Sequence, residues 1–438
     1  MIYFSLPSSP KNAFEHIHVS VSTKEPRAAI SQSIAFYMNE IKEKIASREK
    51  DWDVIKKYTN PYEYIHSVVP LRKKSISKYK PISRSYFKMI EILRAFRVDD
   101  PFLPNYKPRP IKTFHLAEGP GGFIEAVCNK RANPLDSYTG MTILYDETDD
   151  NVPAWNKTEY FLSKNPNVRI ETGADGTGNI MRLDNFDHCI SKYGASMDLI
   201  TADGGFDFSQ DFNKQELIIT NLLWGQTCYA LCMQKYGGNF VLKIFDCFYE
   251  QTIDIMYLLS SFYQEVNVCK LQTSRLGNSE KYLVCRGFRM TDNRSFLSTV
   301  RRSFYMVCQN EQIRVAHLLQ PCLFRRPVIL QEELRVLRLL DFPVPRYFVK
   351  RVEEMNAVFG QQQIENIHYT ISIIDKNSKH DRLEQLTKQN TQKCITWCVE
   401  HGVAYNNFSS SNMFVDAKRE TMVIDPEPVE EDCIAVVI

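Results

Sequence analysis

The chain has 438 residues, about two to three times the length of a typical domain, so we expect two or three domains or one large domain with extensions. Hydrophobic residues make up 44% and charged residues 24%, which excludes a wholly disordered chain. The 54 basic and 52 acidic residues leave a net charge of +2, so the overall balance gives no reason to propose a polyanionic partner.

Residues 1–75 are polar and carry a helical pattern. Ile34, Met38, Ile41 and Ile45 recur at helical spacing, which predicts a helix with one face docked on another part of the protein. The segment TNPYEYIHSVVP that follows contains two prolines and is interpreted as a connector. We expect a helical N-terminal extension.

Residues 76–290 change to short apolar runs that alternate with longer amphipathic ones. The predicted strands are 111–117, 138–144, 197–203, 238–245, 266–271 and 281–288, and predicted helices between them include 122–131, 215–236 and 251–263. This alternation is typical of a parallel α/β sheet covered by helices on both faces. The short loop before the last strand predicts instead an antiparallel pair at the edge of the sheet.

Residues 291–438 have a mainly helical pattern, clearest in VEEMNAVFGQQQIENIHYTISIID and LEQLTKQNTQKCITWCVEHG. The last nineteen residues, from Glu420 on, hold six acids and no Lys or Arg. We expect a helical C-terminal domain that ends in an acidic tail.

The twelve cysteines are spread along the chain without a CxxC pair. We interpret them as reduced, small apolar residues, and we expect no metal site. The N-terminus lacks a basic segment followed by an apolar one, and nowhere do about 18 apolar residues run together. An intracellular protein without a membrane span is expected.

A glycine-rich turn, LAEGPGGFIEA, follows the predicted strand 111–117 and opens a helix. Glycines allow a ligand to approach the backbone closely, and a helix N-terminus offers free N–H groups. The spacing departs from GxGxxG because Ile124 stands at the third glycine position, which favours a ligand without a pyrophosphate over NAD. A purely structural turn is the alternative.

Charged residues stand at the ends of neighbouring predicted strands. Asp203 ends the strand 197–203, Lys243 lies inside FVLKIF, and Glu280 precedes the last strand. Each alone fits an ordinary ion pair, but their joint location favours a site in the crevice beyond the strand ends. Lys88, in the helix SRSYFKMIEIL, falls off the apolar face, so periodicity alone predicts a solvated side chain there.

A basic strip without acids runs from Ser67 to Ile90. Its members are Arg72, Lys73, Lys74, Lys78, Lys80, Arg84 and Lys88. The strip is either a solvated loop or a surface that tracks RNA phosphates. Phe245, Phe248 and Tyr249 are candidates for stacking on the bases of a nucleic acid, with core packing as the alternative.

Five motifs occur in order between residues 80 and 290, namely SRSYFKMIEIL, LAEGPGGF, ADGGFD, GGNFVLKIFD and TSRLGNSEKYLVCRGF. Together they resemble the FtsJ-like ribose 2′-O-methyltransferases, most closely the cap-specific mRNA branch. The flanks WDVIKKYTNPYEYIH and QIENIHYTI resemble, more weakly, FtsJ-like proteins of large DNA viruses. The resemblance implies a Rossmann-like methyltransferase sheet, mostly parallel with an antiparallel last strand.

The resemblance also implies the site residues. A catalytic tetrad falls on Lys88, Asp203, Lys243 and Glu280. S-adenosyl-L-methionine would lie beside Asp203 and against Glu118, Gly119, Pro120, Gly121, Gly122 and Phe123. Its adenosine end would lie near the loop 173–180, where many relatives carry GDI and this chain has Gly178-Asn179-Ile180. The missing carboxylate puts the contact at Asn179 in doubt, and Asp175 is the candidate to replace it.

The implied reaction is methyl transfer to a ribose 2′-hydroxyl of RNA, at the first transcribed nucleotide of capped mRNA (cap 1 formation). Lys243 is the expected base, which requires a neutral amine. Burial and the like charge of Lys88 favour the neutral form, whereas Asp203 and Glu280 favour the ammonium ion. The residues leave this balance open, and a charged lysine would instead stabilise the developing alkoxide.

Two alternatives stay open: a ribosomal or transfer RNA 2′-O-methyltransferase, and a non-catalytic RNA-binding subunit of a capping complex. The long flanks argue against the first and the complete tetrad against the second. Expected partners are capped mRNA or other RNA, with other capping or transcription proteins as further candidates and no membrane. Expected locations are the nucleus or cytoplasm of the host cell, or a virion if the protein is viral.

Overall fold

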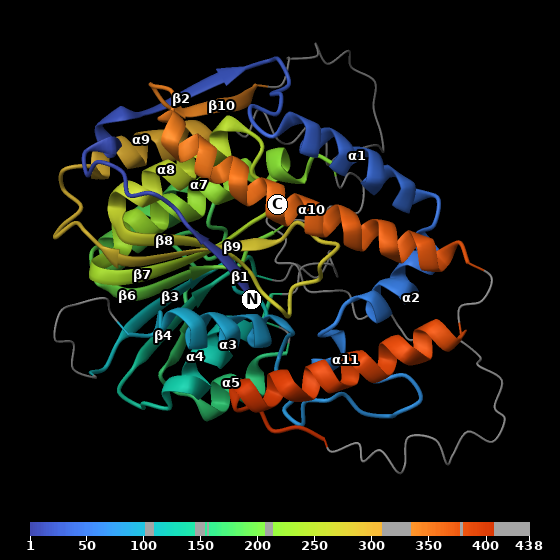
Figure 1. Ribbon diagram of the computed structural model, residues 1–438. Coiled ribbons are helices and arrows are strands. Elements are labelled where there is room, and N and C mark those ends of the chain that lie inside the picture. Colours follow the sequence, from blue (N-terminus) through green and yellow to red (C-terminus); the bar gives the residue numbers. More distant parts are fainter. Residues whose placement is uncertain are drawn as a thin grey trace, which may run out of the picture.

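The protein is built around an eight-stranded sheet. Its strands are β1 (Ile2–Ser5), β3 (Lys112–Leu116), β4 (Ser137–Met141), β5 (Val168–Ile170), β6 (Met197–Ala202), β7 (Gln234–Ile244), β8 (Tyr263–Lys270) and β9 (Lys281–Phe288), in the order β1-β8-β9-β7-β6-β3-β4-β5 (Figure 1). The computed structural model describes residues 1–100, 109–144, 154–155, 157–205, 213–308, 334–376 and 380–406. The predicted acidic tail from Glu420 lies outside these residues.

The strands from β3 to β7 in the chain are parallel, and β9 is antiparallel to both β7 and β8. The expected mostly parallel sheet with an antiparallel last strand is confirmed. The expected position of the last pair at the sheet edge is wrong, because β9 lies between β7 and β8 and β1 pairs with the outer side of β8. The apolar run in β9, buried along nearly its whole length, fits an inner strand.

Helices cover both faces of the sheet (Figure 1). One face carries α6 (Leu183–Tyr193), α7 (Gln215–Met233), α8 (Glu250–Phe262) and α9 (Leu297–Cys308); the other carries α3 (Ser85–Phe96), α4 (Gly122–Arg131), α5 (Glu159–Lys164) and α11 (His380–His401). Neighbouring residues of one strand serve opposite faces, as Val241 packs under the second group and Leu242 under the first. The parallel α/β sheet with two covered faces is therefore confirmed.

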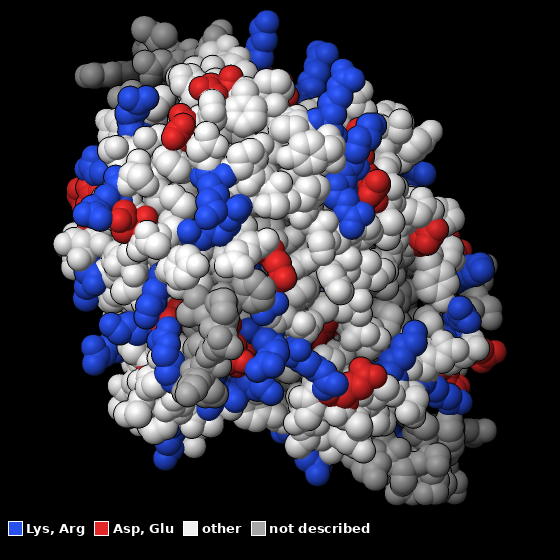
Figure 2. Space-filling view, turned by 60° about the vertical axis from the view of Figure 1, so that its left-hand side comes forward, with Lys and Arg blue, Asp and Glu red and all other residues white. Residues whose placement is uncertain are grey.

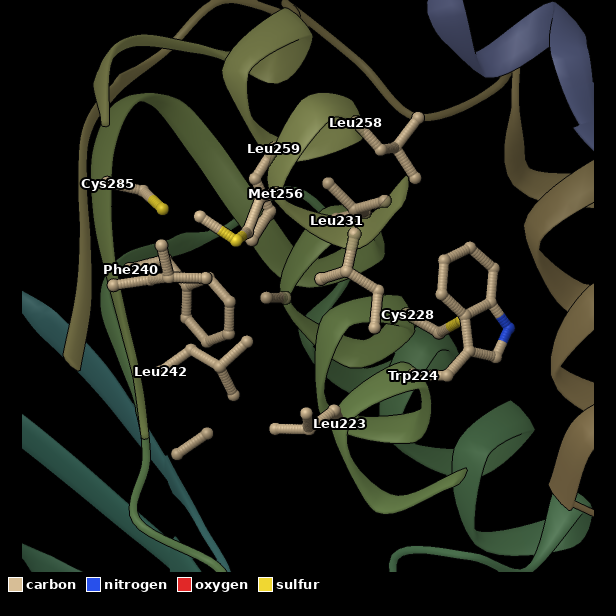
Figure 3. Close-up of a cluster of buried hydrophobic side chains, with 14 of the residues drawn as sticks. Leu223, Trp224, Cys228, Leu231, Phe240, Leu242, Met256, Leu258, Leu259 and Cys285 are labelled. Atoms are coloured by element: carbon tan, nitrogen blue, oxygen red, sulfur yellow. The ribbon is translucent and has the colours of Figure 1, made fainter. Parts of the chain in front are cut away.

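The larger core lies between the sheet and the first group of helices. Figure 3 shows Leu223 of α7 and Met256 and Leu259 of α8 on the side of Phe240, Leu242 and Cys285 of the sheet, whereas Trp224 and Cys228 of α7 and Leu258 of α8 lie on the side turned away from it. Helix α7 is buried on nearly all sides because α9 covers the side turned away from the sheet. There the ring centroids of Phe304 in α9 and Tyr229 in α7 lie 6.0 Å apart. The ten cysteines among the described residues are all buried free thiols.

The expected helical extension before residue 76 contains α1 (Gln32–Ala46) and α2 (Glu49–Thr59), but it also contributes strands. Besides β1 in the main sheet, β2 (Ile17–Ser22) pairs with β10 (Arg335–Leu340). The predicted apolar face of α1 docks on α10 (Arg346–Ile374), where Met38 and Ile41 pack against Ile367 and Ile371. Segments before residue 76 and after residue 290 thus lie side by side.

The residues after 290 also join the sheet's own cores. Phe304 of α9 and Phe348 of α10 belong to the larger cluster, and Trp397 of α11 belongs to the cluster on the opposite face. In the part of the chain that the structure describes, no helix is both long and apolar enough to cross a membrane.

Replacement of Leu242 by Ala tests this core. The side chain is fully buried between the sheet and α7, so we expect a loss of about 2–5 kcal/mol in the free energy of unfolding, measured by chemical denaturation. Leu135→Ala is the matched control because Leu135 is 74% exposed, and it should change stability by less than about 0.5 kcal/mol. Equal costs for both variants would contradict the described core.

Candidate active site

The predicted site residues meet at the carboxyl ends of the parallel strands, where the strand order reverses between β3 and β6. The glycine turn follows β3, Asp203 follows β6, and Lys243 lies one residue before the end of β7. Lys88 comes from the first turns of α3, and Glu280 directly precedes β9. Five separate segments therefore contribute to one site.

Two ion pairs hold the four charged side chains. The Lys88 Nζ donates to Glu280 Oε2 at 2.8 Å, and the Lys243 Nζ lies 3.4 Å from Asp203 Oδ1. Lys243 also donates to the backbone carbonyl of Asp203 at 2.6 Å, and the Tyr282 hydroxyl donates to Asp203 Oδ1 at 2.8 Å. Lys243 is thus a buried lysine whose amine has polar partners, which a lysine inside an apolar strand requires.

Glu280 is ionised in this crevice. Burial by itself raises the pKa of Glu280, but Lys88 and Lys243 outweigh that effect and lower the pKa to about 2. The Ser274 hydroxyl donates to its second oxygen at 2.5 Å. Lys270 of β8 holds the segment in front of β9 by donating to the carbonyl of Glu280 at 2.9 Å. We did not predict Ser274 or Tyr282, although both lie inside the motif TSRLGNSEKYLVCRGF.

The prediction from periodicity that Lys88 is solvated is wrong. Its side chain is 12% exposed and turns toward Glu280. Helix α3 buries more than one face, because Phe87 contacts Trp397 of α11 while Tyr86 contacts Tyr79. A residue off the main apolar stripe can therefore still point into the protein.

The glycine turn packs tightly against its own chain. A Cβ at Gly122 would lie 2.1 Å from the Ser85 hydroxyl of α3, and Gly121 adopts a φ of +115° that favours glycine. The Glu118 carboxylate accepts the backbone N–H groups of Phe123 at 2.7 Å and Ile124 at 2.9 Å. These two N–H groups at the start of α4, expected to be free for a ligand, are occupied by Glu118. Burial raises the pKa of Glu118 well above its ordinary value.

The side chains of the loop 173–180 organise that loop. Asp175 accepts the backbone N–H and the hydroxyl of Thr177, and Asn179 accepts the backbone N–H of Met181 at 2.8 Å. Glu171, which no motif indicated, accepts the backbone N–H of Gly173 at 3.0 Å. Burial raises the pKa of Glu171, but hydrogen bonds from Lys192 and Tyr193 outweigh it and lower the pKa to about 2.

The candidate stacking aromatics follow Lys243 along the chain. Phe245 belongs to the larger core and Phe248 is also buried, so the alternative of core packing describes both in this structure. Tyr249 is half-buried. Glu216 of α7 fixes this segment because its carboxyl accepts the backbone N–H groups of Phe248 and Tyr249 at about 3.0 Å.

The basic strip is divided by the fold. Lys73, Lys74, Lys78 and Lys80 are exposed, and Arg72 is partly exposed. Lys88 belongs to the crevice, and Arg84 lies 3.8 Å from the buried carboxylate of Glu63. On the face drawn in Figure 2, basic and acidic side chains are interspersed and the basic ones are the more frequent. Among the described residues no cluster of three or more His, Cys, Asp or Glu could hold a metal ion.

Comparison with known proteins points to one family. Residues 81–288 match the family model of FtsJ-like methyltransferases. A Danio rerio protein named "Cap-specific mRNA (nucleoside-2'-O-)-methyltransferase 2" is 30% identical over 297 residues, which cover 62% of this chain and 37% of that protein. A Trypanosoma brucei brucei protein named "Cap-specific mRNA (nucleoside-2'-O-)-methyltransferase 1" is 31% identical over 217 residues, which cover 49% of this chain and 52% of that protein.

The chain thus spans about half the length, or less, of these curated relatives. A solved structure of human methyltransferase-like protein 13 in complex with SAH is 10% identical, with a TM-score of 0.29 over 56% of this chain and 95% of that chain. The resemblance of the flanks to viral proteins stays a prediction.

The variant Lys88→Met tests the first ion pair. Because the folded-state pKa of Glu280 lies below its ordinary value of 4.5, its ionisation stabilises the fold above about pH 4.5, and this contribution is lost as pH falls through 2. Removing the partner of the buried carboxylate should lower the free energy of unfolding at pH 7 by about 3–5 kcal/mol. Lys78→Met, at an exposed lysine, should cost less than about 0.5 kcal/mol in the same denaturation experiment.

The variant Glu216→Gln tests the raised pKa of the buried carboxyl of Glu216. Burial raises the pKa of Glu216 from 4.5 to about 7, so between these values the folded state keeps a proton that the unfolded state has lost. The stability of the wild type relative to Glu216→Gln should therefore fall by roughly 3 kcal/mol between pH 4.5 and pH 7.5. Denaturation of both proteins across this range gives the difference. A constant difference would contradict the raised pKa.

Proposed function

Because residues 81–288 form an FtsJ-like methyltransferase domain, we propose that the protein transfers a methyl group from S-adenosylmethionine to a ribose 2′-hydroxyl of mRNA near the cap, at the first transcribed nucleotide. The observation that carries this proposal is the meeting of Lys88, Asp203, Lys243 and Glu280 at the reversal point of the strand order. The names of the relatives support the choice of capped mRNA as substrate.

The residues around the crevice fit the cofactor. When bound, S-adenosylmethionine supplies an electrophilic methyl group on a positively charged sulfur. Asp203 and Glu118 place carboxyl groups at the ends of β6 and β3, and burial together with the charge of Asp203 raises the pKa of Glu118. A cation bound beside them would favour their ionised forms. Since Glu118 already occupies two N–H groups of α4, we propose that it supports the turn while the backbone of residues 119–122 lines the cofactor site.

We propose that the Lys243 amine, held by Asp203, acts on the attacking ribose hydroxyl. A ribose hydroxyl is a weak nucleophile at neutral pH and needs a base or a stabilised alkoxide. The Asp203 carbonyl and carboxylate hold the Lys243 Nζ, and Glu280 interacts with it electrostatically. The amine takes the proton of the attacking hydroxyl when neutral and stabilises the alkoxide when charged. The ion pair of Lys88 with Glu280 fixes the position of that carboxylate.

The path of the RNA is a further part of the proposal. The exposed lysines at 73, 74, 78 and 80 precede α3, which carries Lys88. No acidic residue interrupts the sequence between Ser67 and Ile90, so this strip offers a run of positive charge to phosphates next to the target ribose. Other capping or transcription proteins are candidate partners, and the nucleus or cytoplasm is the candidate location.

Methyl transfer to short RNAs of one sequence, with and without a cap, tests the function. We expect methylation of the capped RNA at the first transcribed nucleotide, mapped by digestion and mass spectrometry. Lys243→Ala should lower kcat by about 100-fold or more. Lys235→Ala, at a partly exposed lysine of the same strand, should retain wild-type kcat.

Equal methylation of the capped and uncapped RNAs would contradict the cap assignment, and methylation of ribosomal or transfer RNA alone would favour that alternative. Unchanged kcat in Lys243→Ala would contradict the mechanism. A protein that binds RNA and the cofactor but transfers no methyl group would fit the non-catalytic alternative.

A further inference from the structure

Another buried carboxylate, Glu63, is joined to the segments of the tetrad without being part of it. It belongs to the short helical turn η2 (Glu63–Ile65), in the segment interpreted from the sequence as a connector. Its side chain is fully buried. Arg275 donates to both of its oxygens, at 2.8 and 3.1 Å, and Arg84 lies 3.8 Å away. Burying a charged carboxylate costs free energy unless it is paired, so these contacts indicate that the segment has a structural role beyond connecting two elements.

The two arginines belong to the two segments that bring Lys88 and Glu280 together. Arg84 lies four residues before Lys88, one helical turn away on the same side of the helix. Arg275 follows Ser274, whose hydroxyl donates to Glu280. Glu63 thus joins Arg84 and Arg275, as Glu280 joins Lys88 and Ser274. The contacts close a ring: Glu63 binds Arg84, the chain leads from Arg84 to Lys88, and Lys88 binds Glu280. The segment before β9 then leads from Glu280 back to Arg275, which binds Glu63.

Charge keeps this ring closed. Burial by itself would raise the pKa of Glu63, but Arg84, Arg275 and His66 hold it well below its ordinary value. Asn60 donates to the same carboxylate at 2.7 Å and Ser67 at 3.1 Å, so its remaining lone pairs are used. The bidentate contact with Arg275 fixes the angle as well as the distance of the segment before β9.

A third contact on the far side of Lys88 shows that the docking is continuous. Glu91, one turn further along α3, accepts the backbone N–H groups of Gln272 at 2.8 Å and Thr273 at 2.7 Å. Helix α3 therefore contacts the segment 272–280 directly at two successive turns, through Lys88 and Glu91, and Arg84, just before the helix, is joined to that segment through Glu63. Only the turn of Arg84 depends on a residue from outside both segments, and that residue is Glu63.

We propose that Glu63 is a positioning residue of the methyltransferase site, which holds Arg84 and Arg275 so that Lys88 and Glu280 meet at the distance that the reaction requires. The proposal rests on the proposed function. Glu63 touches neither the reacting atoms nor the cofactor turn, so it acts through the geometry of the tetrad. A misplacement of about 1 Å at a reacting group can lower a rate by about 100-fold.

The test compares kcat, KM and stability in Glu63→Gln, which keeps the shape of the side chain and removes its charge. We expect kcat to fall by about 100-fold while KM for S-adenosylmethionine changes less than about twofold. Asp254→Asn is the matched control, because Asp254 is also buried and accepts two hydrogen bonds from one arginine, Arg338, at 2.9 Å. It joins α8 to β10, so it should lower the melting temperature and leave kcat unchanged, assayed below that temperature.

A double-mutant cycle with Glu280→Gln separates positioning from general stability. If Glu63 acts through Glu280, Glu63→Gln should cost less than about threefold in kcat once Glu280 is replaced. The full 100-fold loss in that background would overturn the proposal, and so would wild-type kcat in Glu63→Gln alone. Arg275→Lys is the second variant should Glu63→Gln fail to fold. It keeps a cation near Glu63 but loses the bidentate contact, and it should show the same fall in kcat with a smaller loss of stability.

The failure of the proposed function is distinguishable from the failure of this inference. If the wild-type protein transfers no methyl group to any RNA, the proposed function is wrong. The positioning role is then decided by crystal structures of the wild type and Glu63→Gln. The inference requires the distance of 2.8 Å between Lys88 Nζ and Glu280 Oε2 to lengthen in the variant, and an unchanged distance overturns it.

Discussion

The need to neutralise buried charge governs how this protein is assembled. Lys243 lies on an inner strand and Glu280 at the start of another, and neither could remain charged there without partners. Those partners come from α3 and from the turn after β6, segments far apart in the chain. Each ion pair therefore also joins two elements, and the crevice is held in shape by the same contacts that make its charges tolerable.

The sheet was largely predictable because its inner strands are apolar runs of five residues or more, separated by clear helices. β1, with four residues, and β5, with three, were not predicted because their pairing comes from a neighbour and not from their own pattern. The inner position of β9 was not predicted for a similar reason. The short loop between β8 and β9 indicates that the two strands are antiparallel neighbours, but it does not indicate that β7 pairs with the other side of β9 or β1 with the other side of β8.

The candidate site divides in the same way. The positions of Asp203 and Lys243 followed from their places at strand ends, whereas Lys88 on its helix gave a misleading signal and required the family resemblance. Glu63 and Glu171 carried no signal of a site, because a buried acid is recognised by the partners that surround it, and those lie up to 212 residues away in the sequence. Asn179 and Asp175 show the converse, as residues named for a ligand also serve the loop's own hydrogen bonds.

The pairing of β1 with β8 has a consequence for how the chain reaches this structure. Ile2 pairs with Lys270, and the small sheet likewise joins Ile17 to Leu340. During synthesis the first strands must therefore wait for partners more than two hundred residues away, while β3 to β7 can already form local βα units. Closure of such distant pairs is slower than that of local ones, so we expect the amino-terminal segment to dock late and the edge of β8 to stay open to wrong partners until it does.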